Sequence, residues 1–139
     1  MGNITPVSDI VRVHGAERAD QIAIVQGDRR TTWAQLHSRA GQVANLLAAS
    51  GVGAGDRVAF LDKNGIEHFE VFYGAALLNA VCVDVNWRLA APEVEFIVND
   101  SLAKVLVVGH EFLPVLDAIA GNLTTATTLL VIDGAGHAY

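Results

Sequence analysis

The chain has 139 residues, of which 52% are hydrophobic and 17% are charged, and its mean hydropathy is +0.38. This composition excludes a wholly disordered protein and is sufficient for one domain with a substantial hydrophobic core. Acidic residues outnumber basic residues by 15 to 9, and the resulting net charge of −6 argues against a nucleic-acid partner, because nucleic-acid binding requires a basic face.

Signals for membrane insertion, export or disulfide bonding are missing from the sequence. The longest nearly apolar run, residues 71–83, is interrupted by Asn79 and is too short to cross a bilayer. The first residues, MGNITP, lack the basic and apolar regions of a secretory signal peptide. Cys82 is the only cysteine, so it has no partner for an internal disulfide. We therefore expect a cytoplasmic protein without a transmembrane segment.

The N-terminal quarter of the chain predicts a short helix followed by a hairpin. Residues 7–15 have the pattern of a short opening helix. Residues 22–26 and 29–32 flank the dipeptide Gly27-Asp28, and two short runs around such a dipeptide are typical of a β-hairpin.

A long helix is the clearest local signal in the chain. Thr32 and Gln35 have the spacing of a capping box, in which each side chain satisfies a free amide at the helix start. Gly51 can adopt the left-handed conformation that ends many helices. Between these positions, apolar residues at spacings of three and four form one stripe: Trp33, Leu36, Ala40, Val43 and Leu47.

From residue 57 onward, the sequence alternates short apolar strands with amphipathic helices. The expected strands are residues 57–61, 81–85, 104–108 and 129–132. The expected helices cover about residues 66–80, 92–100 and 112–119, with Pro92 and Pro114 in first turns, where proline is tolerated. This alternation predicts an α/β fold with a mostly parallel sheet and right-handed crossovers.

The first helix of this alternating region is expected to begin with a side-chain cap. Asn64 and Glu67 have the residue types and spacing of such a cap. The apolar stripe predicted for the same helix is Ile66, Phe69, Tyr73, Ala76, Leu77 and Ala80. We therefore expect this stripe to face the core.

Phosphate-binding motifs are absent from the sequence. The glycine-rich segment 51–56 has Asp56 where a dinucleotide fingerprint requires its third glycine. The segment also leads from a helix into a strand, so no helix N-terminus follows it to face a pyrophosphate. We interpret it as a turn. No G-x-x-x-x-G-K-[ST] sequence occurs, which excludes a Walker-type phosphate loop in these residues.

No catalytic or metal-binding constellation is visible in the sequence. The zinc signature H-E-x-x-H begins at His110, but its fifth position is Pro114. The histidines are scattered over positions 14, 37, 68, 110 and 137. Glu67 and His68 are adjacent on a helix and point about 100° apart, so they do not share a target. Cys82 lies in an apolar strand, where a thiol is normally inert. We expect no catalytic, cofactor-binding or metal-binding residues.

Three stretches of the sequence resemble one enzyme family. They are TTWAQLHSRAGQVANLL (31–47), GDRVAFLDKNGIEHFEVFYGAALLNAVCVDVNWRL (55–89) and PEVEFIVNDSLAKVLVV (92–108). In this order and spacing they are similar to the adenylate-forming enzymes, specifically to the fatty acyl-CoA synthetase branch. Two positions depart from that family's pattern: Asn79 replaces a glycine before the second strand, and Asp84 replaces a proline after it.

The resemblance implies a two-step reaction. A fatty-acid carboxylate attacks the α-phosphate of ATP to give an acyl-adenylate and pyrophosphate, and the thiol of coenzyme A then displaces AMP. The full-length parent is expected to use ATP, Mg²⁺ and coenzyme A and to have a mobile C-terminal domain that supplies a lysine. The phosphate loop, the adenine-contacting motif, the ribose-binding aspartate and the catalytic lysine are expected beyond Tyr139. The chain alone is therefore expected to bind no cofactor and to be inactive.

The same resemblance predicts the domain organisation. Residues 1–139 are expected to form a single partial domain, the N-terminal portion of the large N-terminal domain of an acyl-CoA synthetase-like fold. Such a segment leaves an apolar face uncovered, so we expect self-association as a two-fold homodimer. Two alternatives stay open: a non-catalytic interaction or small-molecule-binding module on the same scaffold, and a free-standing nucleotide binder of flavodoxin-like type.

Overall fold

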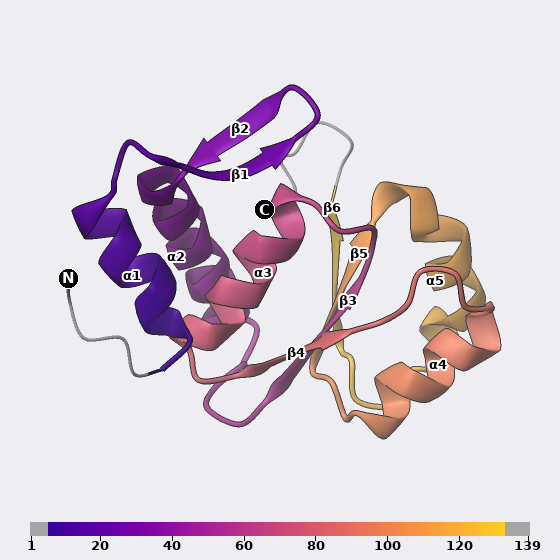
Figure 1. Ribbon diagram of the computed structural model, residues 1–139. Coiled ribbons are helices and arrows are strands. Elements are labelled where there is room, and N and C mark those ends of the chain that lie inside the picture. The colour runs from indigo at the N-terminus through magenta and orange to yellow at the C-terminus, as the bar shows by residue number, and fades with distance from the viewer. Residues whose placement is uncertain (1–5, 133–139) are drawn as a thin grey trace.

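The predicted alternation of strands and helices builds a four-stranded parallel sheet in the computed structural model, which describes residues 6–132 (Figure 1). The strands are β3 (Arg57–Leu61), β4 (Val81–Asp84), β5 (Val105–Gly109) and β6 (Thr128–Ile132), in the spatial order β4-β3-β5-β6. The predicted α/β class is thereby confirmed. The first five residues, MGNIT, which bear on the question of a secretory signal, lie outside the described part of the chain.

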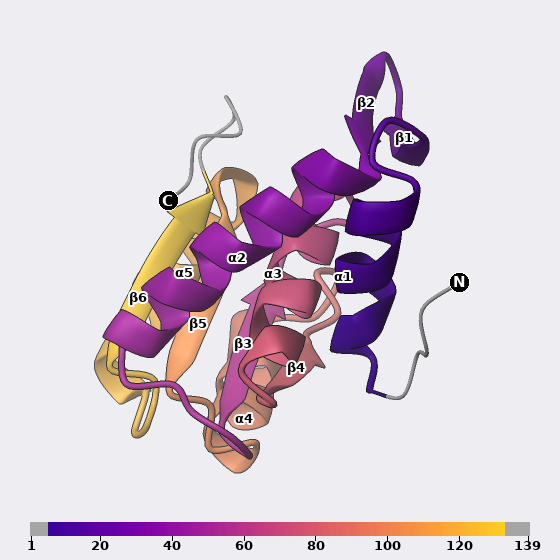
Figure 2. The same ribbon diagram turned by 90° about the vertical axis from the view of Figure 1, so that its left-hand side faces the viewer.

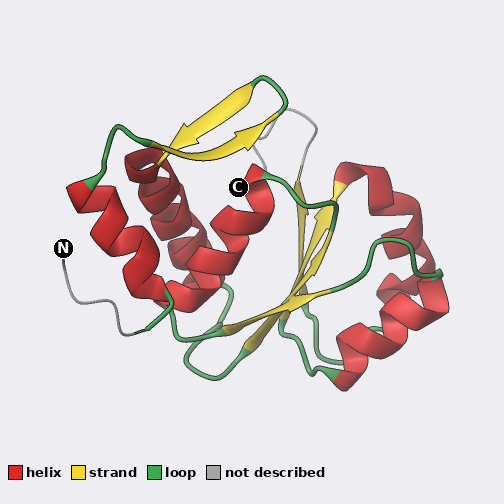
Figure 3. Ribbon diagram, viewed as in Figure 1, coloured by secondary structure: helices red, strands yellow, loops and turns green. Residues whose placement is uncertain are grey.

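Helices cover both faces of this sheet, as Figure 3 shows. One face carries α2 (Trp33–Ala49) and α3 (Ile66–Leu77), with α1 (Ser8–Glu17) packed against them (Figure 2). The other face carries α4 (Ala91–Asp100) and α5 (Leu113–Ile119). Two short 3-10 helices, η1 (His110–Phe112) and η2 (Ala120–Asn122), flank α5. No helix within residues 6–132 combines the length and the hydrophobicity that crossing a membrane requires.

The core is divided into two layers by the alternating side chains of the central strands. On β3, Val58 and Phe60 face α2 and α3, whereas Ala59 and Leu61 face α4 and α5. Every residue of β5 is buried, as expected for a parallel strand between two helical layers. The continuous apolar run of β5 in the sequence is therefore explained by burial on both faces.

The predicted hairpin and the predicted capping box are both present. Strand β1 (Ile22–Gln26) pairs in antiparallel fashion with β2 (Arg29–Thr32), separately from the main sheet. At the start of α2, the Gln35 amide donates to Thr32 Oγ1 at 3.2 Å, and the Thr32 amide donates to Gln35 Oε1 at 2.9 Å. Both orphan amides are thus satisfied within one turn.

The start and the buried face of α3 differ from the sequence-based expectation. Asn64 does not cap the helix: Gly65 is the N-cap residue, and the Ile66 amide donates to Gln26 Oε1 in β1 at 3.0 Å. Phe69 was expected in the buried stripe, but it is 41% exposed. The buried residues of α3 are Ile66, Glu70, Val71, Tyr73, Gly74 and Ala75, because the helix packs against both α2 and the sheet.

Candidate functional site

The β3-α3-β4 unit brings a helix start to the end of a strand. Because β3 and β4 are parallel, α3 runs back along the sheet, and its first turn lies near the carboxyl end of β4. His68 is the third residue of α3, and Asp84 is the last residue of β4. Cys82 lies two residues before Asp84, and side chains two apart on a strand share a face. The topology therefore places three chemically active side chains together.

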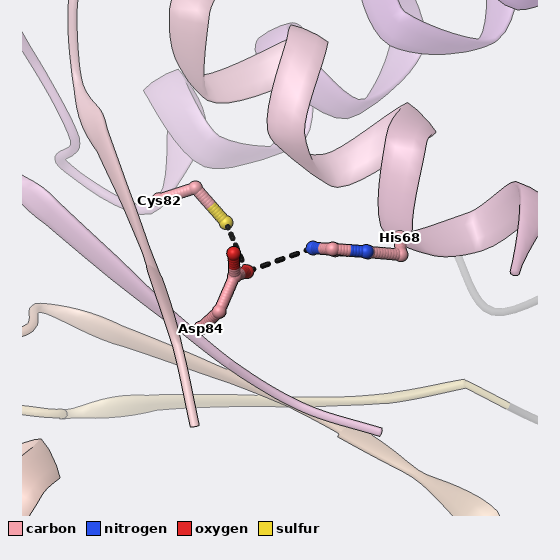
Figure 4. A group of neighbouring side chains, drawn as sticks. All are labelled: His68, Cys82 and Asp84. Carbon is pink, nitrogen blue, oxygen red and sulfur yellow. Dashed lines mark hydrogen bonds and ion pairs between the residues drawn. The ribbon is translucent and has the colours of Figure 1, made fainter. Parts of the chain in front are cut away.

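These three side chains are in direct contact (Figure 4). His68 Nε2 lies 2.7 Å from Asp84 Oδ1, and the Cys82 thiol donates to the same oxygen at 3.5 Å. One ligand atom from each residue lies within 4.8 Å of the other two. The His68 side chain is 15% exposed and stacks on Phe60, with ring centroids 4.7 Å apart, whereas the Asp84 side chain is 59% exposed. The cluster is thus anchored on the buried side and open to solvent on the other.

The order of these contacts argues against a nucleophilic cysteine. In a Cys-His pair, the imidazole accepts the thiol proton directly. Here the Asp84 carboxylate lies between the thiol and the imidazole. Burial of Cys82 raises the pKa of its thiol strongly, and the Asp84 carboxylate raises it further. Burial and the Asp84 carboxylate therefore favour the protonated thiol over the thiolate.

Glu67 and His68 do not act on one target, as the sequence predicted. Glu67 forms an ion pair with Arg29, whereas His68 contacts Asp84. The sequence did not connect His68 with Asp84 or with Cys82, because these residues are 16 and 14 positions apart. The signal that connects them is topological: a histidine in the first turn of a crossover helix lies beside the last residue of the following parallel strand.

A pocket of about 290 Å³ opens beside the cluster, at the carboxyl ends of β3 and β4. It is lined by Phe60, Asp62, Asn64, His68, Asp84, Val85, Asn86, Trp87 and Arg88. Burial raises the pKa of the Asp62 carboxyl, although the Lys63 amide donates to it at 2.7 Å and lowers the pKa in part. The carboxyl of Asp62 also occupies the space that a Cβ on Gly109 would fill, so it is wedged against the end of β5.

The indole of Trp87 forms one wall of this pocket and is flanked by cations. Arg88 Cζ lies 4.2 Å and Lys63 Nζ 5.2 Å from the ring centroid. Lys63 is also bound to both carboxylate oxygens of Glu111, at 2.8 and 2.6 Å. Such cation–π contacts hold an aromatic ring in place. The pocket therefore combines a fixed aromatic wall with carboxyl, amide and guanidinium groups.

Mg²⁺, which the family resemblance implies for the full-length parent, does not fit the cluster. Mg²⁺ requires near-octahedral oxygen ligands. His68 and Cys82 offer a nitrogen and a sulfur instead, and only Asp84 offers an oxygen. We therefore place no magnesium ion at these residues.

Fold and pocket together define an α/β protein whose parallel sheet is covered by helices on both faces, with a polar pocket at the carboxyl ends of its strands. The family model for the AMP-binding enzyme matches residues 11–138. The chain belongs to this family.

Relatives in this family include several acyl-CoA ligases. The chain is 51% identical over 92 residues to the long-chain-fatty-acid–CoA ligase FadD13 of Mycobacterium tuberculosis, a match that covers 66% of this chain and 18% of that protein. It is 38% identical over 104 residues to a long-chain-fatty-acid–CoA ligase of Thermus thermophilus, over 75% of this chain and 19% of the relative. The chain thus spans about a fifth of the length of these relatives.

Solved structures give the same result for the fold. The anthranilate CoA ligase AuaEII, solved with anthranoyl-AMP, has a TM-score of 0.88 and 35% identity over 95% of this chain and 26% of its own. The N-terminal domain of FACL13 from Mycobacterium tuberculosis, solved with an inhibitor, has a TM-score of 0.86 and 38% identity over 96% of this chain and 34% of its own. The predicted resemblance to acyl-CoA synthetases is therefore confirmed.

Proposed function

We propose that this chain is part of an ATP-dependent fatty acid–CoA ligase that acts in the cytoplasm and uses ATP, Mg²⁺ and coenzyme A. The observation that carries the proposal is the 51% identity to FadD13 over 92 residues. Relatives described as hydroxybenzoate–CoA ligases match less closely than FadD13, at 37% and 34% identity. The reaction would convert the carboxylate to an acyl-adenylate and then to an acyl-CoA thioester.

The residues of this chain would contribute scaffold to that reaction. The sequence contains no Walker-type phosphate loop, and the segment 51–56 is a turn between α2 and β3. Stabilisation of the charge that develops on the α-phosphate requires donors aimed at it. We propose that residues 1–139 form a single partial domain and that these donors come from other parts of the enzyme. The chain alone is then inactive.

A chimera tests whether this segment can serve as part of a fatty acid–CoA ligase. The matching 92-residue segment of FadD13 is replaced by the segment of this chain, and formation of long-chain acyl-CoA is measured. We expect a folded chimera to retain ligation of long-chain fatty acids. A second chimera that carries Val107→Asp in the buried strand β5 is the control and is expected to lose both fold and activity. A folded chimera that forms no long-chain acyl-CoA contradicts the proposal.

A second assay tests the proposed inactivity of the chain alone. The purified 139-residue chain is incubated with a fatty acid, ATP and Mg²⁺, and release of pyrophosphate is measured. We expect no release above the protein-free control. Pyrophosphate release that depends on the fatty acid shows that the chain carries its own activating groups and overturns the scaffold role.

We also propose that the isolated chain forms a homodimer through the outer surface of α4. Phe96 is 67% exposed and Leu102 is 54% exposed, and Phe96 lines an apolar groove of about 470 Å³ with Leu89, Pro92, Glu93 and Ile97. Exposed apolar surface of this kind favours pairing with a second copy. Light scattering after size exclusion is expected to give twice the chain mass for the wild type and a monomer for Phe96→Glu. Val25→Glu on the hairpin is the control and is expected to remain dimeric; a monomeric wild type refutes the proposal.

A further inference from the structure

We propose that His68, Cys82 and Asp84 form a zinc-binding site at the carboxyl end of β4. The inference is independent of the proposed ligase function, because it rests on the geometry of these three residues and is tested by metal binding alone. The three residues offer a nitrogen, a sulfur and an oxygen that lie within 4.8 Å of one another. Imidazole, thiolate and carboxylate are the ligands that zinc uses in proteins.

Two of the three donor distances, those to Asp84, are near the values of a tetrahedral site, and the third, between His68 and Cys82, lies within 4.8 Å. Zinc bonds of about 2.0 Å to nitrogen and oxygen and about 2.3 Å to sulfur place the ligand atoms about 3.3 to 3.6 Å apart at tetrahedral angles. The Cys82 Sγ to Asp84 Oδ1 distance is already 3.5 Å. The 2.7 Å distance from His68 Nε2 to Asp84 Oδ1 must open by about 0.6 Å to meet the tetrahedral value. A rotation of the exposed Asp84 side chain supplies this movement.

The charges of the cluster also suit a divalent cation. A Cys82 thiolate and the Asp84 carboxylate carry two negative charges, which a neutral His68 and one Zn²⁺ convert to a net charge of zero. No lysine or arginine among residues 6–132 forms an ion pair with Asp84, so no protein cation competes for its carboxylate. Binding releases the thiol proton to solvent, since only the thiolate is a zinc ligand. His68 binds as the neutral tautomer with its hydrogen on Nδ1, so Nε2 offers its lone pair to the ion and no second proton is released.

The three ligands are mounted on regular secondary structure. Cys82 and Asp84 are held in β4 by its parallel pairing with β3, in which Cys82 is opposite Val58 and Asp84 is opposite Phe60. His68 is held in α3, and its ring stacks on Phe60. Ligands on a helix and a strand keep their positions better than ligands on loops. The fourth coordination position faces solvent beside Asp84, so we infer a water molecule or an anionic ligand there, the open arrangement found with three protein ligands.

Cobalt(II) absorption tests the site directly. Co²⁺ is titrated into the full 139-residue chain under reducing conditions, and the near-ultraviolet thiolate-to-cobalt charge-transfer band is measured. Zn²⁺ is then added as a competitor. We expect one Co²⁺ per chain, a charge-transfer band that identifies the Cys82 sulfur as a ligand, and loss of the band when Zn²⁺ displaces cobalt. Far-ultraviolet circular dichroism of each sample verifies that the chain is folded.

Substitutions assign the ligands. Cys82→Ser is expected to abolish the charge-transfer band, and His68→Gln and Asp84→Asn are each expected to weaken Zn²⁺ binding by more than about tenfold, the range that even outer-shell changes reach. His110→Gln, at an exposed histidine outside the cluster, is the control and is expected to bind like the wild type. The proposed site is refuted if the folded wild-type chain gives no charge-transfer band. It is also refuted if His68→Gln and Asp84→Asn both titrate with Co²⁺ like the wild type.

Discussion

Gly74 of α3 lies in close contact with α2, and Gly74→Ala tests whether this contact is as tight as the structure indicates. A Cβ atom at Gly74 would lie 2.7 Å from Val43 Cγ1, 2.9 Å from Val43 Cβ and 3.2 Å from the Ala40 carbonyl oxygen. Optimal separations between carbon atoms are about 3.5 to 4.0 Å. Val43 is fully buried and β-branched, so its side chain has no free rotamer into which it can withdraw.

The size of the effect follows from two opposing terms. Alanine is more favourable than glycine in a helix interior by about 0.8 to 1.0 kcal/mol. Inserting a methyl group into a packed contact costs about 1 to 3 kcal/mol. Gly41 in α2 provides the matched control, because a Cβ at Gly41 meets no atom within 4 Å. Gly41→Ala therefore gains the helix term alone, and the two variants should differ in unfolding free energy by about 1 to 3 kcal/mol, the packing term.

Thermal unfolding of the two variants at one protein concentration measures this difference. For 139 residues, an unfolding entropy of about 2.1 cal/mol/K per residue gives about 0.3 kcal/mol/K for the chain. A difference of about 1 to 3 kcal/mol then corresponds to a melting temperature about 3 to 10 °C lower for Gly74→Ala than for Gly41→Ala. Equal protein concentration is needed because self-association shifts the apparent stability. A Gly74→Ala variant that melts at or above Gly41→Ala refutes the tight α2–α3 contact.

Three further predictions concern titration and capping. Burial raises the pKa of Glu70, although Arg39 lowers it in part, so protonated Glu70 contributes stability below the ordinary carboxyl pKa, and this stability is lost as pH rises through the raised pKa. In urea unfolding, the wild type should therefore lose stability relative to Glu70→Gln as pH rises from the ordinary to the raised pKa. A difference between the two proteins that does not change with pH contradicts this prediction. Burial and, to a lesser extent, Asp84 raise the pKa of the Cys82 thiol, so iodoacetamide at about pH 8 should react more slowly with the folded chain than with the unfolded chain. Asp84→Asn should speed the reaction of the folded chain. An equal rate in Asp84→Asn shows that the Asp84 charge does not contribute to the raised pKa of the thiol. Thr32→Ala removes the cap of α2 and should lower the free energy of unfolding by about 1 kcal/mol, which a melting curve detects; no change means that the capping box does not contribute.

Local sequence signals were sufficient for most helices and strands. The capping box of Thr32 and Gln35, the turn at Gly27 and the apolar strand β5 all depend on residues within a few positions of one another, and all are present. The parallel sheet was also predictable, because a strand-helix-strand alternation leaves few other arrangements. The spatial order β4-β3-β5-β6 does not follow from the alternation alone, since it depends on contacts between elements that are distant along the chain.

The start of α3 shows why some local predictions fail. The sequence offers Asn64 as a cap, but the Gln26 side chain from the hairpin accepts the Ile66 amide, 40 positions away. The same Gln26 side chain occupies the space beside Gly65, where a Cβ would lie 2.7 Å from its Nε2 atom. A nonlocal acceptor therefore replaces the local one. Reading along the chain cannot reveal this contact, because only the docking of the hairpin on α3 brings the two residues together.

The two departures from the family pattern, Asn79 and Asp84, have different structural consequences. Asn79 adopts a left-handed backbone conformation with φ of 55°, so it performs the turn that a glycine would otherwise form. Asp84 keeps the regular parallel pairing with Phe60, and the backbone continues in register, since the Val85 amide donates to the Phe60 carbonyl at 2.9 Å. What Asp84 adds is a carboxylate that contacts both His68 and Cys82. Asn79 thus preserves the backbone conformation of the turn, whereas Asp84 adds side-chain contacts and leaves the backbone pairing of β4 unchanged. Substitution of Asp84 therefore removes its carboxylate chemistry without removing a backbone interaction of the sheet.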